Sequence, residues 1–271
     1  MANYHGKTGN LKFGAAAIAN LQNWNLTTVS ETDDATSTGD TWKVPIPGLT
    51  DFNASASGKS QKALDTTALI GTSASLVLSY DVSGPNWAAA AILTGLTETV
   101  SFENNGTISW TFTGNDAAGL VYAAATGVAA TGESDAFSGK LMKGTYDLLD
   151  ADGDSTAVVA FVDMREWSVS LTCDTADATS VHAEPLTNSG RVRVAGFIGG
   201  TVTVTTLASV DPVISDGALV TMELHRTQTP ADGYYDGNAI CTGNTRGVDS
   251  SGVDTITYNF ILTGLLDLKV A

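Results

Sequence analysis

The sequence predicts an all-β fold made of two tandem domains. Three observations point to it: the composition, a period of two within short apolar runs, and an internal repeat at about half the chain length. Of the 271 residues, 37 are Thr and 28 are Gly, while 15% are charged and 43% are apolar. Abundant Thr beside short Val, Ile and Leu runs favours strands, and this apolar share is enough to form a core.

Apolar and small polar residues alternate in the predicted strands. In Thr107–Phe112, the side chains of Ile108, Trp110 and Phe112 share one face, and residues 255–260 repeat the pattern. Such a period of two predicts a sheet with one apolar and one polar face. The same criterion predicts strands at Trp24–Val29, Phe52–Ser57, Ala74–Tyr80, Trp167–Leu171 and Thr201–Leu207.

Other local signals mark turns, arms and a helix. Asn104-Asn105-Gly106 favours a hairpin turn, because Asn and Gly tolerate positive φ. Gln61–Ile70, closed by Gly71, is the best helix candidate. The polar stretches Ser30–Thr41 and Thr172–Ser189 are too long for tight turns and predict matching loops or hairpin arms.

The internal repeat rests on shared spacing. Ala91–Gly95 precedes Thr107–Phe112, with eleven residues between them, and residues 239–243 precede residues 255–260 in the same way, 148 positions later. We therefore predict a first domain at 1–125, a linker at 126–137 and a second domain at 138–271. Further matches are Gly48–Ser55 with Gly196–Thr203 at 148, Leu76–Leu78 with Met222–Leu224 at 146, Leu21–Leu26 with Met164–Val169 at 143, and Gly6-Lys7 with Gly139-Lys140 at 133.

The charge excludes one class of function. The net charge is −16, divided as −5 over residues 1–120 and −11 over residues 121–271. A pI near 4.2 argues against a protein that binds nucleic acid through a basic surface. The first residues lack the apolar stretch of a secretory signal, and the most apolar window, Ala117–Ala130, is too short to span a bilayer. We expect a protein made in the cytoplasm, without membrane insertion.

Motifs for catalysis or metal binding are weak. Asp150–Asp154 resembles the start of a calcium loop, but Ser155 and Phe161 stand where the helix–loop–helix version needs Gly and Glu. No phosphate loop or nucleophile elbow is present. We expect no catalytic residue, cofactor or metal. Residues considered and set aside are His5, His182 and His225, without metal-type spacing, and Glu31, Asp33 and Asp34, as a solvated acidic loop rather than a glycosidase pair.

Aromatic residues and cysteines are assigned to the core. Trp24 and Trp167 hold equivalent places in the two copies, as do Trp110 and Tyr258. Because they recur among apolar partners on alternating strands, they suit core anchoring better than sugar stacking. Cys173 and Cys241 are expected to be buried as small apolar residues rather than joined in a disulfide.

The order of elements in the first half resembles the tail tube proteins of long-tailed bacteriophages. The resemblance covers about residues 6–116, and the second half is included only through the repeat. Its motifs are structural rather than catalytic. They are Gly9-Asn10-Leu11-Lys12-Phe13-Gly14, Ile18-Ala19-Asn20-Leu21-Gln22-Asn23-Trp24-Asn25-Leu26-Thr27, a Thr/Asp-rich loop ending in Gly39-Asp40-Thr41-Trp42-Lys43, Gly48-Leu49-Thr50-Asp51-Phe52, and Ile108-Ser109-Trp110-Thr111-Phe112-Thr113-Gly114.

The resemblance implies a function in the virion tail. Tail tube domains are small β-sandwiches or barrels with a flanking helix, six of which form a ring around a continuous inner β-barrel. Stacked rings conduct DNA from the capsid to the host. With two such domains per chain, three chains would form one ring, contacting other tail proteins and letting double-stranded DNA pass without specific binding. The alternative within the family is a ring of six chains whose second domain decorates the outside.

Three other readings remain open at this point. The fold class suits a β-sandwich adhesin or surface-layer protein, for which the missing secretory signal is unfavourable. It also suits an enzyme on a β scaffold and the secretion tubes related to phage tails. An acidic or neutral lumen lined by Thr and Ser would let DNA slide, whereas a basic one would hold it through phosphate contacts.

Overall fold

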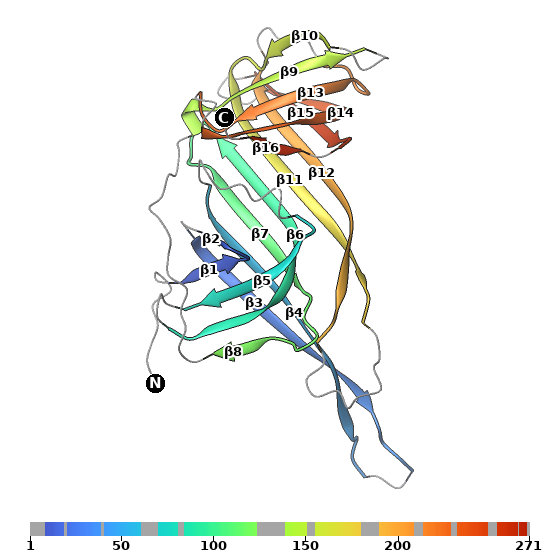
Figure 1. Cartoon of the computed structure of the whole chain (residues 1–271). Coiled ribbons are helices and arrows are strands. Elements are labelled where there is room, and N and C mark those ends of the chain that lie inside the picture. The colour runs from blue at the N-terminus through green and yellow to red at the C-terminus, as the bar shows by residue number, and fades with distance from the viewer. Residues whose placement is uncertain are drawn as a thin grey trace.

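The fold is almost entirely antiparallel β-structure, so the all-β prediction is confirmed (Figure 1). Within the described residues, the one helical element is the 3-10 turn η3 (Gly139–Leu141). The predicted linker 126–137 and, except for Ile70, the predicted helix Gln61–Ile70 lie outside those residues. The computed structural model describes residues 9–18, 21–38, 41–60, 70–80, 84–123, 139–150, 155–179, 190–208, 214–228, 232–248, 254–264 and 266–269.

The strands fall into two sets along the chain. The first set is β1 (Asn10–Phe13), β2 (Ala16–Ile18), β3 (Leu21–Asp34), β4 (Pro45–Lys59), β5 (Ser73–Ser79), β6 (Asn86–Ser101), β7 (Thr107–Gly114) and β8 (Val121–Ala123). The second set is β9 (Lys143–Leu149), β10 (Ser155–Ala160), β11 (Met164–Asp177), β12 (Arg193–Leu207), β13 (Leu219–His225), β14 (Tyr234–Val248), β15 (Asp254–Leu262) and β16 (Asp267–Lys269). Every segment predicted as a strand lies in one of them, except that β5 ends one residue before Tyr80.

The two sets pair in the same order. In the first set the order is β2-β1-β5-β6-β7-β4-β3, with β8 beside β6. In the second set it is β10-β9-β13-β14-β15-β12-β11, with β16 beside β14. Each strand of one set therefore has a counterpart with the same neighbours in the other.

The registers of the paired strands also correspond. Trp24 lies opposite Ala56, and Trp167 opposite Val204, the residue 148 positions after Ala56. The β6–β7 ladder has a bulge at Gly95, and the β14–β15 ladder has one at Gly243, again 148 positions later. These correspondences extend the sequence repeat to the pairing of individual residues.

A positive-φ glycine occupies the same place in both sets. Gly71 has φ 75° and Gly217 has φ 85°. The Gly71 amide donates to the Leu93 carbonyl at 2.9 Å, and the Gly217 amide donates to the Cys241 carbonyl at 2.7 Å. A side chain at either position would strain the backbone, because L residues other than Asn and Asp rarely adopt this conformation.

Each set folds into two packed layers. β1 and β5 lie over β4 and β7, so that the rings of Phe13 and Phe112 are 5.1 Å apart at their centroids. In the second set, β9 and β15 supply the buried Tyr146 and Phe260 at the corresponding positions. The inward residues of alternating strands thus form a sandwich core, as the period of two predicts.

One ladder joins the two sets. β6 pairs with β11, and in Figure 1 they run side by side through the middle of the molecule. This pairing, here called the internal junction, creates a continuous sheet with the order β3-β4-β7-β6-β11-β12-β15-β14. The sheet is not closed into a barrel: within the described residues it ends at β3 on one side and, from Gly243 onward, at β14 on the other, because the pairing of β14 with β13 stops at Ile240.

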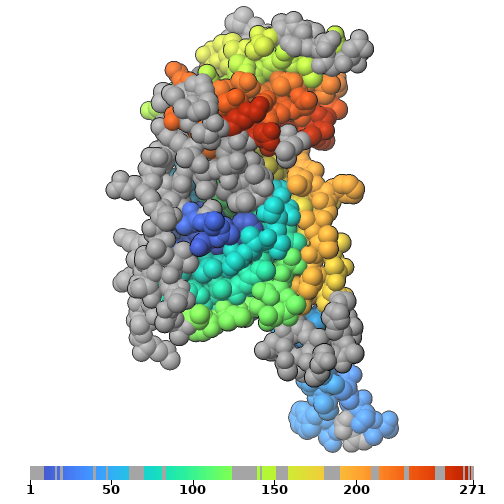
Figure 2. Space-filling view, viewed as in Figure 1, coloured from blue at the N-terminus to red at the C-terminus, as the bar shows by residue number. Residues whose placement is uncertain are grey.

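The first predicted hairpin arm is present and protrudes, whereas residues 180–189 of the second lie outside the described residues. β3 and β4 run past the body of the molecule to a tip where Trp42 is 83% exposed (Figures 1 and 2). The ends of β11 and β12 form the second arm, up to Asp177 and from Arg193.

Candidate assembly interface

The two ends of the eight-stranded sheet are open edges. β11 pairs with β12 on one side and β6 on the other, but among the described strands its counterpart β3 pairs only with β4. Likewise, residues 95–101 of β6 pair with β11, while their counterparts in β14, from Gly243 onward, have β15 as their only partner in the described part of the chain. Within the described residues, the chain therefore leaves open the two edges that correspond to the partners in the internal junction.

The internal junction is antiparallel and continuous from Glu166 to Thr172. On one face, small hydroxyl side chains bond across the ladder: Thr97 to Ser170 at 3.1 Å, and Thr99 to Ser168 at 3.0 Å, between their oxygen atoms. The apolar side chains of the opposite face are buried in the core. The open edges of β3 and β14, which correspond to the two strands of this junction, can pair with another strand in the same way unless they are covered.

A buried charge network lies on the core side of this junction. Glu98 of β6 is fully buried, and its carboxylate accepts hydrogen bonds from Arg226 Nε at 2.9 Å and Nη2 at 2.7 Å. The hydroxyls of Ser60 and Tyr235 also donate to it. Burial disfavours the charge on Arg226, but the facing carboxylate outweighs this and raises its pKa. Burial and the same carboxylate raise the pKa of Tyr235.

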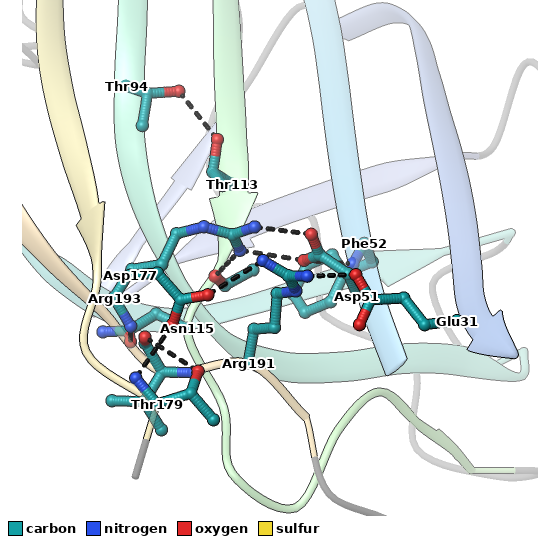
Figure 3. Close-up of polar contacts among 12 residues, drawn as sticks. Glu31, Asp51, Phe52, Thr94, Thr113, Asn115, Asp177, Thr179, Arg191 and Arg193 are labelled. Atoms are coloured by element: carbon teal, nitrogen blue, oxygen red, sulfur yellow. Dashed lines mark hydrogen bonds and ion pairs between the residues drawn. The ribbon is translucent and has the colours of Figure 1, made fainter. Parts of the chain in front are cut away.

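A second ion-pair network fastens the first hairpin arm to the second set of strands (Figure 3). Arg193 Nη1 donates to Asp51 Oδ1 at 2.8 Å, and both side chains are largely buried. Arg191 bridges Asp177, at 2.8 Å, and Glu31. Burial opposes ionisation of Asp51, but its contacts with Arg193 prevail and lower the pKa of Asp51. The network therefore links β3 and β4 directly to β11 and β12.

The open edge of β3 borders a cavity lined by aromatic side chains. Trp24, Tyr80 and Trp87 line this space of about 590 Å³ together with polar residues of β3. The ring centroids of Trp24 and Tyr80 are 5.2 Å apart, and Trp87 Nε1 lies 3.5 Å from the Tyr80 hydroxyl oxygen. A neighbouring cavity of about 550 Å³ is also lined by Trp87, together with Thr28 and Val29. We call the three aromatic side chains the aromatic socket.

The face of the sheet away from the core is rich in small polar side chains. Among the described residues, the middle of this face carries no charged side chain, and charges such as Lys59 and Glu166 lie where strands end. The residues of this face, here called the threonine face, are Thr97, Thr99, Thr107, Ser109, Thr111, Ser168, Ser170, Thr201, Thr203, Thr205, Thr257 and Asn259.

The structure revises one aromatic assignment. Trp110, Trp167 and Tyr258 are buried in the core, as predicted. Trp24, predicted to anchor the core with them, packs against it but is only half-buried, because among the described strands none pairs with the β3 edge as β6 pairs with β11. Both thiols, Cys173 and Cys241, are buried and unbonded to each other, and burial raises their pKa values.

The remaining candidates do not form a chemical site among the described residues. His225 is buried, stacks on Tyr234 and contacts Glu223 at 3.1 Å. Glu31 pairs with Arg191, and Asp34 accepts hydrogen bonds from Thr36. No group of three metal-binding side chains occurs in the described part of the chain, and no helix there is long and apolar enough to cross a bilayer. His5, His182 and residues 151–154 lie outside that part.

Sequence reasoning missed the charged groups that join the two sets of strands. Asp51 and Arg193 are 142 positions apart and carry no local motif. Glu98 gives one signal, because it occupies an inward position between Leu96 and Val100 on an alternating strand. A charged residue at such a position needs a buried partner.

Comparisons with known proteins identify no family. Neither a protein-family profile nor a curated protein sequence matches the chain. Among solved structures, it is similar to a chain in the virion of a native gene transfer agent particle, with 18% identity, TM-score 0.39, and 45% of this chain aligned to 100% of that chain. It is also similar to a chain in the tail of an empty gene transfer agent particle with C6 symmetry, with 17% identity, TM-score 0.35, and 48% of this chain aligned to 94% of that chain. Each similarity spans about half of this chain.

Proposed function

We propose that this chain is a structural subunit of a phage-like tail tube. In this proposal, residues 1–125 and 138–271 are two tube domains joined by the linker 126–137. Three chains close a ring of six domains with exact threefold and approximate sixfold symmetry, rings stack into a tube, and DNA passes through it. The observation that carries the proposal is the pair of open edges, β3 and β14, which correspond to the two strands of the internal junction.

Repetition of the junction favours a closed ring. A chain that already contains one junction between equivalent halves can form the next one with a second copy, using the edges that remain open. Head-to-tail contacts of this kind close into rings when the rotation allows it. Closure also removes the exposed edges, which otherwise invite uncontrolled pairing.

The expected dimensions suit a conduit. Each chain contributes eight strands to the continuous sheet, so three chains supply twenty-four. With strands about 4.8 Å apart and tilted by about 40°, the backbone of such a barrel is about 48 Å in diameter. This leaves room for a DNA duplex after side chains are added. The threonine face would line the lumen, because the other face of the sheet packs against the core.

The charge of that face suits transport of DNA without binding. A lumen lined by Thr and Ser offers hydroxyls but few cations, so phosphates displace few counterions on it and are held weakly. The overall charge of −16 adds to this effect. We assign no reaction, cofactor or metal to the chain, and place it in the virion tail, in contact with other tail proteins, after synthesis in the host cytoplasm.

The test is the mass and shape of the purified protein. Native mass spectrometry of isolated rings should give three chains, and negative-stain micrographs of concentrated protein should show rings or tubes with a central channel. Six chains per ring would mean that the second domain lies outside the wall. A protein that stays monomeric at high concentration contradicts the tube and favours a surface-binding module.

A further inference from the structure

We infer that Arg246 of one chain inserts into the aromatic socket of a second copy, while the open edge of β14 pairs with the open edge of β3. The occupant of the cavity beside Trp24, Tyr80 and Trp87 is thus this protein itself. The inference rests on the proposed function, because it specifies the contact by which the chains of a ring meet.

The internal junction fixes the register. Glu98 lies opposite Val169 in that junction. The counterpart of Glu98, 148 positions later, is Arg246, and the counterpart of Val169, 143 positions earlier, is Leu26. The junction between chains therefore places Leu26 opposite Arg246. In the same register Thr27 faces Thr245 and Thr28 faces Asn244.

Arg246 points to the correct side of the sheet. It lies opposite Ile256 in the β14–β15 ladder, and Ile256 is buried in the core. Opposite residues of an antiparallel ladder project from the same face, so the Arg246 side chain leaves on the core side, as Glu98 does. It is exposed, and its guanidinium has no ion-pair partner among the described residues.

The socket matches this cation chemically. In the internal junction, the Glu98 carboxylate is held by Arg226 and Tyr235. The counterparts of these two residues in the first set are Tyr80, 146 positions before Arg226, and Trp87, 148 positions before Tyr235. In the junction between chains, the cation Arg246 thus takes the place of the anion Glu98. The aromatic rings of the socket take the place of its cationic partner, Arg226. Arginine over Trp and Tyr faces is a favourable cation–π arrangement, and it strengthens when water is excluded.

The outer face of the two strands is complementary as well. The hydrogen bond between Thr97 and Ser170 spans the internal junction. Its counterpart between chains joins Thr245 to Thr27, so both positions again carry a hydroxyl. An unrelated peptide could add to the β3 edge, but it would have no reason to supply both this hydroxyl and a cation one residue further along.

A disulfide test checks the register. Directly opposite residues are about 4.5–5.5 Å apart between Cα atoms, within the range that a disulfide spans. The variant T27C/T245C should form chain-to-chain disulfides on mild oxidation and give dimers and trimers on a non-reducing gel. The matched control N23C/T245C should not, because Asn23 lies about 13 Å along the strand from Thr27. Within one chain Thr27 and Thr245 lie at opposite ends of the sheet, so an intramolecular bond does not compete.

A second set of variants tests the socket. We expect R246A to raise the concentration needed for assembly about tenfold or more, as a lost contact of about 1.4 kcal/mol does, and R246K to recover part of the loss. The control R165A removes an arginine that stacks on Phe102 of its own chain, and it should assemble normally. Far-UV circular dichroism should show all variants folded, since Arg246 is exposed.

The results separate this inference from the proposed function. If rings or tubes form but T27C/T245C gives no disulfide, or R246A assembles normally, the proposed contact is wrong and the proposed tube function is unaffected. Efficient bonding that yields open ladders longer than trimers supports the contact and contradicts the three-chain ring. Bonding in N23C/T245C rather than T27C/T245C overturns the register.

Discussion

Removing the arginine of the buried network is the sharpest test of how the two halves are held together. Arg226 is 1% exposed and Glu98 0% exposed, with two charge-assisted hydrogen bonds between them. Arg226→Met keeps the volume but leaves the carboxylate buried without a cation. Breaking a buried pair in this way costs about 3–5 kcal/mol. At about 2–4 °C per kcal/mol for a chain of this size, the melting temperature should fall by about 10 °C.

The assay is equilibrium unfolding in urea, followed by tryptophan fluorescence on dilute, unassembled protein. Arg246→Met is the matched control, because it removes an exposed arginine and should change the free energy of unfolding by less than about 0.5 kcal/mol. The double variant Glu98→Leu/Arg226→Met should lose less than Arg226→Met alone, since no buried charge remains. A loss below about 1 kcal/mol in Arg226→Met, or single-variant losses that simply add in the double variant, would refute this account of the junction.

Three independent experiments on other residues should show smaller effects. Burial lowers the pKa of His225 below its ordinary value of about 6.5. Its contribution to stability is therefore complete above about pH 6.5 and is lost as the pH falls through the folded-state pKa. The free energy of unfolding should differ less between pH 8 and pH 5 in His225→Asn than in the wild type. Cys173 and Cys241 should react with iodoacetamide at least about a hundredfold more slowly in native protein than in urea, because burial raises their pKa values and blocks access; equal rates would place the thiols at the surface. Asp51→Asn weakens the bond to Arg193 and should lower the free energy of unfolding by about 1–3 kcal/mol; an unchanged urea midpoint would mean that this pair does not hold the arm.

The strands were predictable from the sequence because their signals are local. Alternation in segments such as Thr107–Phe112 specifies both strand and buried face. The repeat was predictable because the two halves keep the same number of residues between equivalent segments, although few of the residues are identical. The junction between β6 and β11 was not predictable, because any open edge can in principle pair with any other. The half-buried state of Trp24 follows from the open edge of β3 and not from its own surroundings in the sequence.

The buried network between Glu98 and Arg226 has a consequence for the order of events in assembly. Both partners belong to one chain, so folding alone brings them together, and no free subunit has to hold a dehydrated carboxylate without its cation. A contact between separate chains lacks this protection, because each side must first survive alone in water. An exposed arginine and half-exposed aromatic rings are stable in the unassembled chain, because water solvates the charge and, among these described residues, no polar group is buried without a partner. In the proposed ring, linking two domains in one polypeptide would let every second junction use a buried ion pair, which a separate subunit is poorly suited to carry before assembly. The linkage would also remove the entropic cost of bringing those two halves together.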